Sequence, residues 1–193
     1  TFFNYLVEEW LASKNPFKAI PKQSITKKEI ETMSKDEFEK LLKILRKPEL
    51  GIQKLSTGES KDLYKEWMTD AVELGLFTGR RNEEIVMMKW KNFSEKDNCI
   101  RIEDFKVNRQ KGNAGENKKY INVPIIKELK NLLIRMGYDK YQNSEKYILA
   151  PEETMERETI KNFMTRSFSH YWKQLDTGKN LSYKHLRKTY ISA

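Results

Sequence analysis

The sequence predicts a mainly α-helical protein with one small antiparallel β-hairpin or sheet, an α+β arrangement. Apolar residues recur at helical spacing over most of the 193 residues. Residues 93–110 and 118–124 instead alternate between apolar and polar, as strands with one buried face do. Apolar residues make up 38% of the chain, which is enough for one real core at this length.

The N-terminal part predicts a join between two domains. Residues 1–14 form an amphipathic helical stretch without a start signal, and we interpret them as the tail of an upstream helical domain. Residues 15–29 contain two prolines and several lysines, which predicts an extended basic linker. We expect residues 30–193 to form the main domain.

Capping signals predict the first helices of that domain. Ser34 and Glu37 form a capping box ahead of an apolar stripe, and Pro48 ends the helix. Residues 49–60 read as a polar loop. A wide apolar face predicts a helix over 61–77, with Gly79 as the left-handed residue that closes it. A short helix is expected over 81–90.

The second half predicts a hairpin followed by helices. The alternating runs 93–110 and 118–124 flank the turn signal GNAGEN, so we expect a β-hairpin with a long flexible tip. Helices are expected over 125–137, 158–175 and 183–193, with a short extended piece over 147–153.

Charge points to a polyanionic partner. The net charge is +9 and the pI is near 9.4, which favours nucleic acid first and an acidic membrane surface second. A single cysteine, Cys99, excludes an internal disulfide and a thiolate zinc cage. No apolar run is long enough to span a bilayer, so we expect no membrane partner and a cytoplasmic protein.

Three clusters of cations could carry chemistry. Arg81 follows the helix-ending glycine, and Glu84 lies one helical step further on, where it could hold the guanidinium. Lys184 and Arg187 share a helical face, and the third cluster comprises Lys106, Arg109 and Lys111 near the hairpin tip. Taken alone, the Arg81 stretch is better explained as a solvated surface pair, the Lys184 cluster is typical of a solvated basic face, and the hairpin cluster of a lysine-protected edge strand.

Together, the three clusters resemble the catalytic domain of tyrosine recombinases, the phage and transposon integrase family. The first box of that family is Thr-Gly-x-Arg, followed three residues later by Glu or Asp, and matches Thr78, Gly79, Arg81 and Glu84. Its second box, His-x-Leu-Arg with lysine accepted first, places Lys184 at the first position and Arg187 at the last. His185 falls one position away, so either Lys184 or His185 takes the histidine's role.

The resemblance implies roles for these residues. Arg81 and Arg187 would neutralise the scissile phosphate, and Glu84 and His185 would orient neighbouring groups. Lys106 would be the general acid for the departing 5′-oxygen, with Lys111 as the competing assignment. Lys184 would bind the phosphate or assist proton transfer. The family uses no metal and no cofactor.

The resemblance also implies partners and a departure from the family. Duplex DNA would be bound by a homotetramer at the nucleoid of a bacterial or phage-infected cell, through basic residues that include Lys14, Lys18, Lys22, Arg109 and Lys111. The nucleophilic tyrosine is expected a few dozen residues beyond Arg187. Tyr190 is too near Arg187 for that role, so we expect this chain to be a fragment that does not cleave DNA alone.

Other functions remain open at this stage. The main alternative is a non-catalytic basic DNA-binding module whose arginines only grip phosphates. An RNA-binding or membrane-surface protein rests on charge alone.

Overall fold

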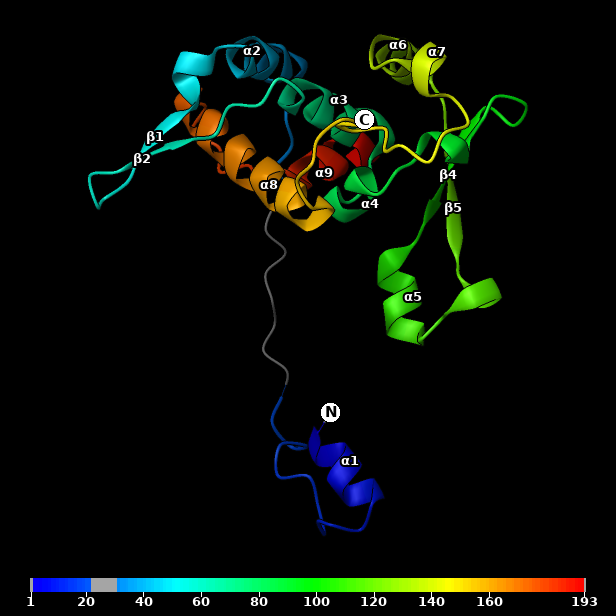
Figure 1. Cartoon of the computed structure of the whole chain (residues 1–193). Helices are drawn as coiled ribbons and strands as arrows, with labels where there is room; N and C mark the ends of the chain where they lie inside the picture. The colour runs from blue at the N-terminus through cyan, green and yellow to red at the C-terminus, as the bar shows by residue number, and fades with distance from the viewer. Residues whose placement is uncertain (1, 22–30, 193) are drawn as a thin grey trace.

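The computed structural model describes residues 2–21 and 31–192, and about half of the described chain is helical (Figure 1). The helices of the main domain are α2 (Lys35–Leu45), α3 (Met68–Thr78), α4 (Asn82–Val86), α5 (Phe105–Lys111), α6 (Lys127–Arg135), α7 (Tyr138–Tyr141), α8 (Arg157–Gln174) and α9 (Lys184–Ser192). Short 3-10 turns occupy Pro48–Gly51, Trp90–Asn92 and Gly115–Asn117.

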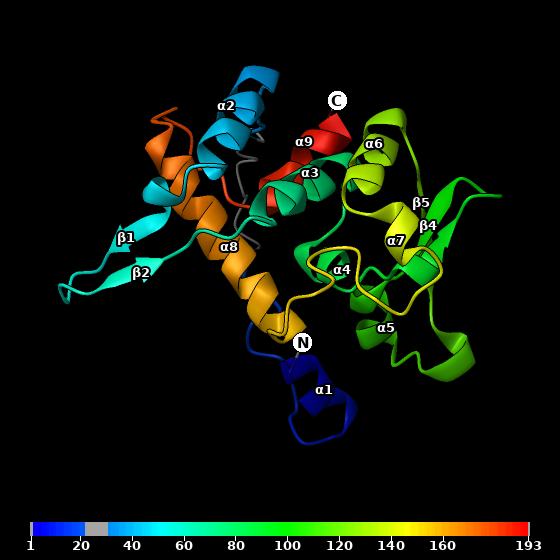
Figure 2. The same cartoon turned by 45° about the horizontal axis from the view of Figure 1, so that its top comes forward.

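Helix α3 lies at the centre of the domain. It is apolar on most of its circumference, as expected for a helix surrounded by others, and it contacts α2, α4, α6, α8 and α9. The views of Figures 1 and 2 agree that α9 lies along α3. Gly75 makes this close approach possible, because a β-carbon there would lie 2.7 Å from Tyr183 Oη and 2.8 Å from Leu186 Cδ1.

Two small antiparallel sheets flank the helices, so the predicted α+β fold class is confirmed. Strands β1 (Ile52–Lys54) and β2 (Ser60–Asp62) form one ribbon. The other sheet has the order β3-β4-β5, with β3 (Phe93–Ser94), β4 (Cys99–Glu103) and β5 (Tyr120–Pro124). Ile100 pairs with Val123 and both are buried, so the register follows the apolar face.

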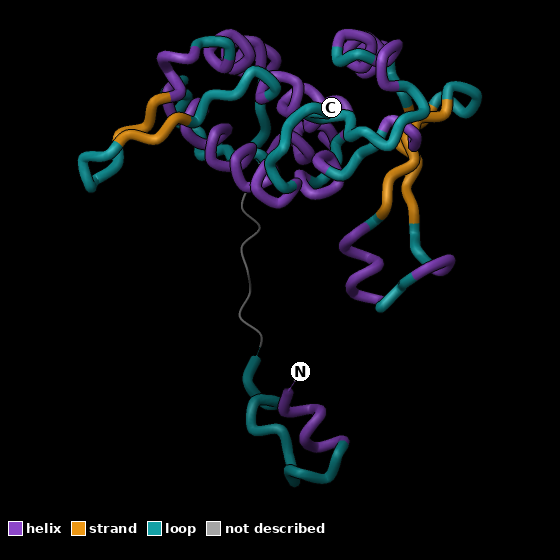
Figure 3. The backbone as a smooth tube through the Cα atoms, viewed as in Figure 1, coloured by secondary structure: helices purple, strands orange, loops and turns teal. Residues whose placement is uncertain are grey.

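The expected hairpin is wrong at its tip. The first alternating run ends as a strand at Glu103. Residues 105–111 form helix α5, which lies beyond the end of the two long strands in Figure 3. Asp104 caps this helix by accepting a hydrogen bond from Val107 N at 3.1 Å, and Gly112 closes it with a φ of 63°. The cap and the closing glycine override the alternating pattern.

The predicted helix over 61–77 is shorter than expected. It begins at Met68, because residues 60–62 pair with 52–54 inside what the sequence indicated as a loop. The Asp62 carboxylate then accepts a hydrogen bond from Tyr64 N at 2.8 Å and turns the chain. The capping box of Ser34 and Glu37 and the left-handed Gly79 are confirmed.

The segment 2–21 folds back on itself. It contains α1 (Phe2–Glu8), whose Phe3 packs on Phe17 with ring centroids 4.9 Å apart. Asn15 Nδ2 donates to Asn4 Oδ1 at 2.6 Å. Most of the predicted linker, including Lys22, lies outside the described residues.

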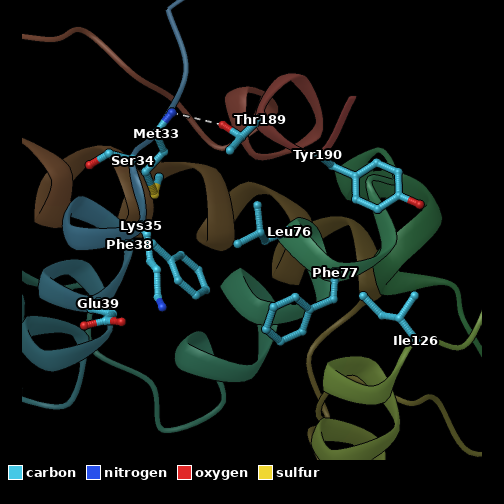
Figure 4. Close-up of a pocket in the computed structure, with 10 residues that line it drawn as sticks. All are labelled: Met33, Ser34, Lys35, Phe38, Glu39, Leu76, Phe77, Ile126, Thr189 and Tyr190. Atoms are coloured by element: carbon cyan, nitrogen blue, oxygen red, sulfur yellow. Dashed lines mark hydrogen bonds between the residues drawn. The ribbon is translucent and has the colours of Figure 1, made fainter. Parts of the chain in front are cut away.

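Helices α2, α3 and α9 border an apolar groove of about 480 Å³ (Figure 4). Phe38, Phe77 and Tyr190 line it, and Met33 N donates to Thr189 Oγ1 at 3.0 Å across one end. The Tyr190 ring also packs on Gly79, where its Cδ1 lies 2.2 Å from the place of a β-carbon. Tyr190 therefore packs against the end of α3.

None of the helices in the described part of the chain combines the length and apolar character needed to cross a membrane.

Candidate active site

The turn between α3 and α4 presents Arg81. Gly79 ends α3 in the left-handed region, and Arg81 then caps α4 in an extended conformation. Its backbone N–H donates to Glu84 Oε2 at 3.1 Å, while its Nη1 donates to Glu84 Oε1 at 2.6 Å. Glu84 is 1% exposed, and Arg81 is its ion-pair partner.

Arg187 reaches the same turn from far along the chain. Its Nη1 donates to the carbonyl oxygen of Gly79 at 2.9 Å. The reach depends on the packing of α9 against α3, which is fixed by buried Leu186 and by a hydrogen bond from the Tyr183 hydroxyl to the Ala71 carbonyl. Tertiary packing therefore brings the two predicted arginines together.

The charges at this turn are predominantly positive. Burial lowers the pKa of Arg187, and the positive charges of Arg81 and Arg80 lower it further, while Glu84 and Asp104 oppose the change. Arginine stays protonated at any physiological pH. Three guanidinium groups thus share two carboxylates, an imbalance that favours a bound anion.

Arg81 keeps one edge of its guanidinium available. Its Nη1 faces both Glu84 and Asp104, the latter at 3.7 Å. Within the described residues, Arg81 Nε and Nη2 donate no hydrogen bond to the protein. A planar fork with two unused donors is suited to the paired oxygens of a phosphate.

Asp104 is a site residue that the sequence reasoning missed. Its carboxylate is 15% exposed and combines the cap of α5 with the contact to Arg81. The signal was an Asp directly after the alternating strand and three residues before Val107, a possible helix N-cap. Continuing the strand pattern through residue 110 concealed it.

The predicted cations of the hairpin lie on α5, not on a strand. Lys106 is exposed in the first turn of α5 and has no ion-pair partner among residues 2–21 and 31–190. Arg109 is exposed and pairs with Glu83 of α4, Nη2 to Oε2, at 2.5 Å. Lys111 is exposed at the far end of the helix.

Asn108, also on α5, is buried. Its Oδ1 accepts from Lys119 N at 2.8 Å, and its Nδ2 donates to Lys119 O at 3.1 Å and Glu103 Oε1 at 3.2 Å. The amide is fully used inside the protein and joins α5 to the end of β5.

The second box contains two residues with different surroundings. Lys184 is exposed at the start of α9. His185 is half-buried, and its Nδ1 accepts a hydrogen bond from Ser182 N at 2.9 Å. Burial lowers the pKa of His185, the Ser182 carbonyl oxygen 3.2 Å from Nδ1 opposes this, and Lys188 and Lys184 add to the lowering. Which of the two replaces the family's histidine stays a prediction.

The remaining predicted contacts are on the surface. Lys14 and Lys18 are exposed in the segment 2–21. Within the part of the chain that the structure describes, no cluster of three or more His, Cys, Asp or Glu side chains is placed to hold a metal ion.

No protein-family model matches the sequence, and no curated protein matches it. Solved structures do. The lambda integrase catalytic core superposes with a TM-score of 0.51 at 16% identity, covering 83% of this chain and 81% of that one. The chain has the fold of the integrase catalytic core.

DNA-bound integrases match this fold over more of the chain. A lambda integrase dimer bound to a COC' core site gives a TM-score of 0.61 at 16% identity, covering 98% of this chain and 61% of that chain. The Tn1549 transposon integrase in complex with a circular intermediate DNA gives 0.60 at 12% identity, covering 98% and 62%. The chain therefore spans about three-fifths of these solved chains, and the expected tyrosine-recombinase catalytic fold is confirmed.

Proposed function

We propose that this chain is the catalytic part of a tyrosine recombinase, which cuts and rejoins duplex DNA through a 3′-phosphotyrosyl intermediate. The observation that carries the proposal is the convergence of Arg81 and Arg187 on the Gly79 turn. Integrases with the same fold are DNA-bound in their solved structures, which supports DNA as the substrate.

In this proposal, the two arginines stabilise charge on the scissile phosphate. A tyrosine hydroxyl attacks phosphorus and gives up its proton to solvent, so that the phosphotyrosyl bond forms while the bond to the 5′-oxygen breaks. The non-bridging oxygens gain charge in the transition state, and guanidinium donors that are already oriented stabilise it. Glu84 fixes the direction of the Arg81 guanidinium.

The proton balance requires an acid for the leaving group. Lys106 would donate a proton to the departing 5′-oxygen, leaving a free 5′-hydroxyl. Lys184 would contact the scissile phosphate or assist this transfer. Rejoining is the reverse reaction with a 5′-hydroxyl from the partner site, so the phosphotyrosyl bond conserves the energy and no ATP is consumed.

The assembly and setting belong to the same proposal. A lambda integrase tetramer bound to a Holliday junction has this fold, which supports a tetramer on two DNA sites for the protein that contains this chain. Exposed Lys14 and Lys18 would contact the DNA backbone, giving a salt-dependent affinity without base reading. We place the reaction on DNA in the bacterial cytoplasm.

The experiment uses the polypeptide that the gene encodes through to its stop codon, so that the nucleophile of the parent protein is present. It is incubated with a nicked duplex carrying its own element end, and SDS-resistant protein–DNA adducts are measured. We expect Arg81→Ala and Arg187→Ala each to lower the cleavage rate by about 100-fold or more, the effect of removing one oxyanion donor. DNA binding should remain largely intact.

Arg46→Ala is the matched control, because Arg46 is an exposed arginine at the end of α2. Cleavage at the wild-type rate by Arg81→Ala or by Arg187→Ala would contradict the site assignment. Tight binding to the duplex by the wild-type polypeptide without any adduct would instead identify a non-catalytic DNA-binding module.

A further inference from the structure

Asp104 connects two elements that the proposed reaction needs in fixed relation. It lies between β4 and α5, and its Oδ1 accepts from Val107 N at 3.1 Å and lies 3.7 Å from Arg81 Nη1. Because this one carboxylate caps α5 and also faces the Arg81 guanidinium, it links the orientation of the guanidinium to the position of α5.

The backbone holds Asp104 in place. Its N–H donates to the carbonyl of Lys119 at 3.0 Å, and its carbonyl accepts from Asn108 N at 2.9 Å. The buried Asn108 side chain makes two more hydrogen bonds to Lys119. The carboxylate is therefore presented from the end of the β4–β5 ladder, a rigid support.

The helix that Asp104 caps carries the predicted general acid. Lys106 is the second residue of α5, inside the turn that the cap orders. A second link, Arg109 to Glu83 at 2.5 Å, joins α5 to α4 further along. Helices α4 and α5 are thus joined at two points. One is the pair of Arg109 with Glu83, and the other is the contact of Asp104 with Arg81, the residue that caps α4.

The direction of the Arg81 fork depends on both of its carboxylates. Glu84 and Asp104 both face Nη1, and this leaves Nε and Nη2 as the edge without protein acceptors among the described residues. Glu84 comes from the same turn as Arg81, whereas Asp104 comes from the sheet. Asp104 is the partner that relates the fork to the rest of the domain.

We propose that Asp104 is a positioning residue that aligns the free edge of Arg81 with the helix carrying Lys106. The inference rests on the proposed function, because it assigns Asp104 a task within that reaction. It adds a carboxylate to the two arginines and the lysine already placed there.

Two substitutions separate the two tasks of the carboxylate. Asp104→Asn keeps an oxygen that can cap α5, since Asn caps helices as well as Asp does, but removes the charge facing Arg81. Asp104→Ala removes both. Asp97→Asn is the matched control, because it makes the same change at an exposed aspartate in the β3–β4 turn of the same sheet.

Cleavage is measured with the full polypeptide on two substrates, one with the natural 5′-oxygen leaving group and one with sulfur in its place. A thiolate leaves without a proton, so the sulfur substrate does not depend on a general acid. We expect Asp104→Asn to slow both substrates equally, by about 10-fold, the low end of the cost of losing an orienting partner. Its denaturation midpoint should stay near that of the wild type.

Asp104→Ala should slow the oxygen substrate more than the sulfur substrate, because it also releases the turn that carries Lys106. Wild-type rates for Asp104→Asn on both substrates, while Arg81→Ala is inactive, would overturn the positioning role and leave the proposed function standing. Equal slowing of both substrates by Asp104→Ala would overturn the link to Lys106. Absence of cleavage by the wild-type polypeptide would refute the proposed function itself.

Discussion

Gly79 stands where both arginines of the candidate site meet, and replacing it by alanine tests that arrangement. Its φ of 59° is a left-handed conformation that residues with a β-carbon rarely adopt. A β-carbon would also lie 2.2 Å from Tyr190 Cδ1 and 2.6 Å from Cγ, so the ring would have to move. Arg187 donates to the Gly79 carbonyl, so a shift of this turn would also displace the Arg187 guanidinium.

A second glycine, Gly112, has the same left-handed backbone but no side chain that a β-carbon would meet. Gly112 ends α5 with φ 63° and ψ 24°, against 59° and 25° at Gly79, and a β-carbon there meets nothing within 4 Å. Gly112→Ala should therefore cost only the backbone strain, about 1 to 2 kcal/mol. Gly79→Ala adds overpacking, typically 1 to 3 kcal/mol, for a total of roughly 2 to 5 kcal/mol.

The assay is urea unfolding of the chain followed by fluorescence of its four tryptophans. Gly79→Ala should lower the free energy of unfolding by more than Gly112→Ala does. The change in the unfolded chain is the same for both variants and cancels in the comparison. Combining Gly79→Ala with Tyr190→Ala removes the ring that would clash, so the double variant should lose less than the two single variants added together.

Equal losses for Gly79→Ala and Gly112→Ala, together with strict additivity for Gly79→Ala and Tyr190→Ala, would refute this reasoning. That result would mean that the ring of Tyr190 does not press on the turn. The packing that brings α9 and Arg187 to Gly79 would then be wrong.

Two further predictions concern α5 and α9. Lys106→Ala should slow DNA cleavage by the full polypeptide more than Lys111→Ala does, because Lys106 lies two residues after Asp104, which contacts Arg81. The reverse order would move the general acid to the far end of α5. For His185, the lowered pKa means that the unfolded chain binds a proton more readily than the folded one. The free energy of unfolding should therefore fall as the pH drops below the ordinary histidine pKa of 6.5, and His185→Asn should weaken that fall when unfolding is measured at pH 7 and pH 5.

Local signals predicted much of the helical fold. The capping box of Ser34 and Glu37 and the left-handed Gly79 depend on residues within a few positions of each other, so the sequence contains the whole cause. The long helix α8 follows in the same way from its apolar spacing.

Two features were missed, one because it depends on a distant contact and one because its local signals are weak. Strands β1 and β2 are short and polar, and only their mutual pairing distinguishes them from a loop. Helix α5 was hidden because the strand pattern continues into it, while its cap and its closing glycine are single residues.

For the candidate site, the sequence predicted which residues belong to it better than how they are arranged in space. Arg81 and Arg187 were implied by a resemblance, but their meeting at Gly79 depends on a packed interface that Gly75 allows between α3 and α9. Asp104 carries no signal of its own beyond that of a helix cap. Its contact with Arg81 exists only once the sheet places it there.

The two ends of residues 104–119 meet. Glu103 and Tyr120 face each other in the last pair of the β4–β5 ladder, and the register of that ladder is fixed by buried side chains elsewhere in the sheet. The exposed tip of this segment, around Gly112 and Gly115, is therefore open to lengthening or shortening without a change in the register of the sheet. Such a change would alter the surface beside α5 while Asp104 and its contact with Arg81 stay in place.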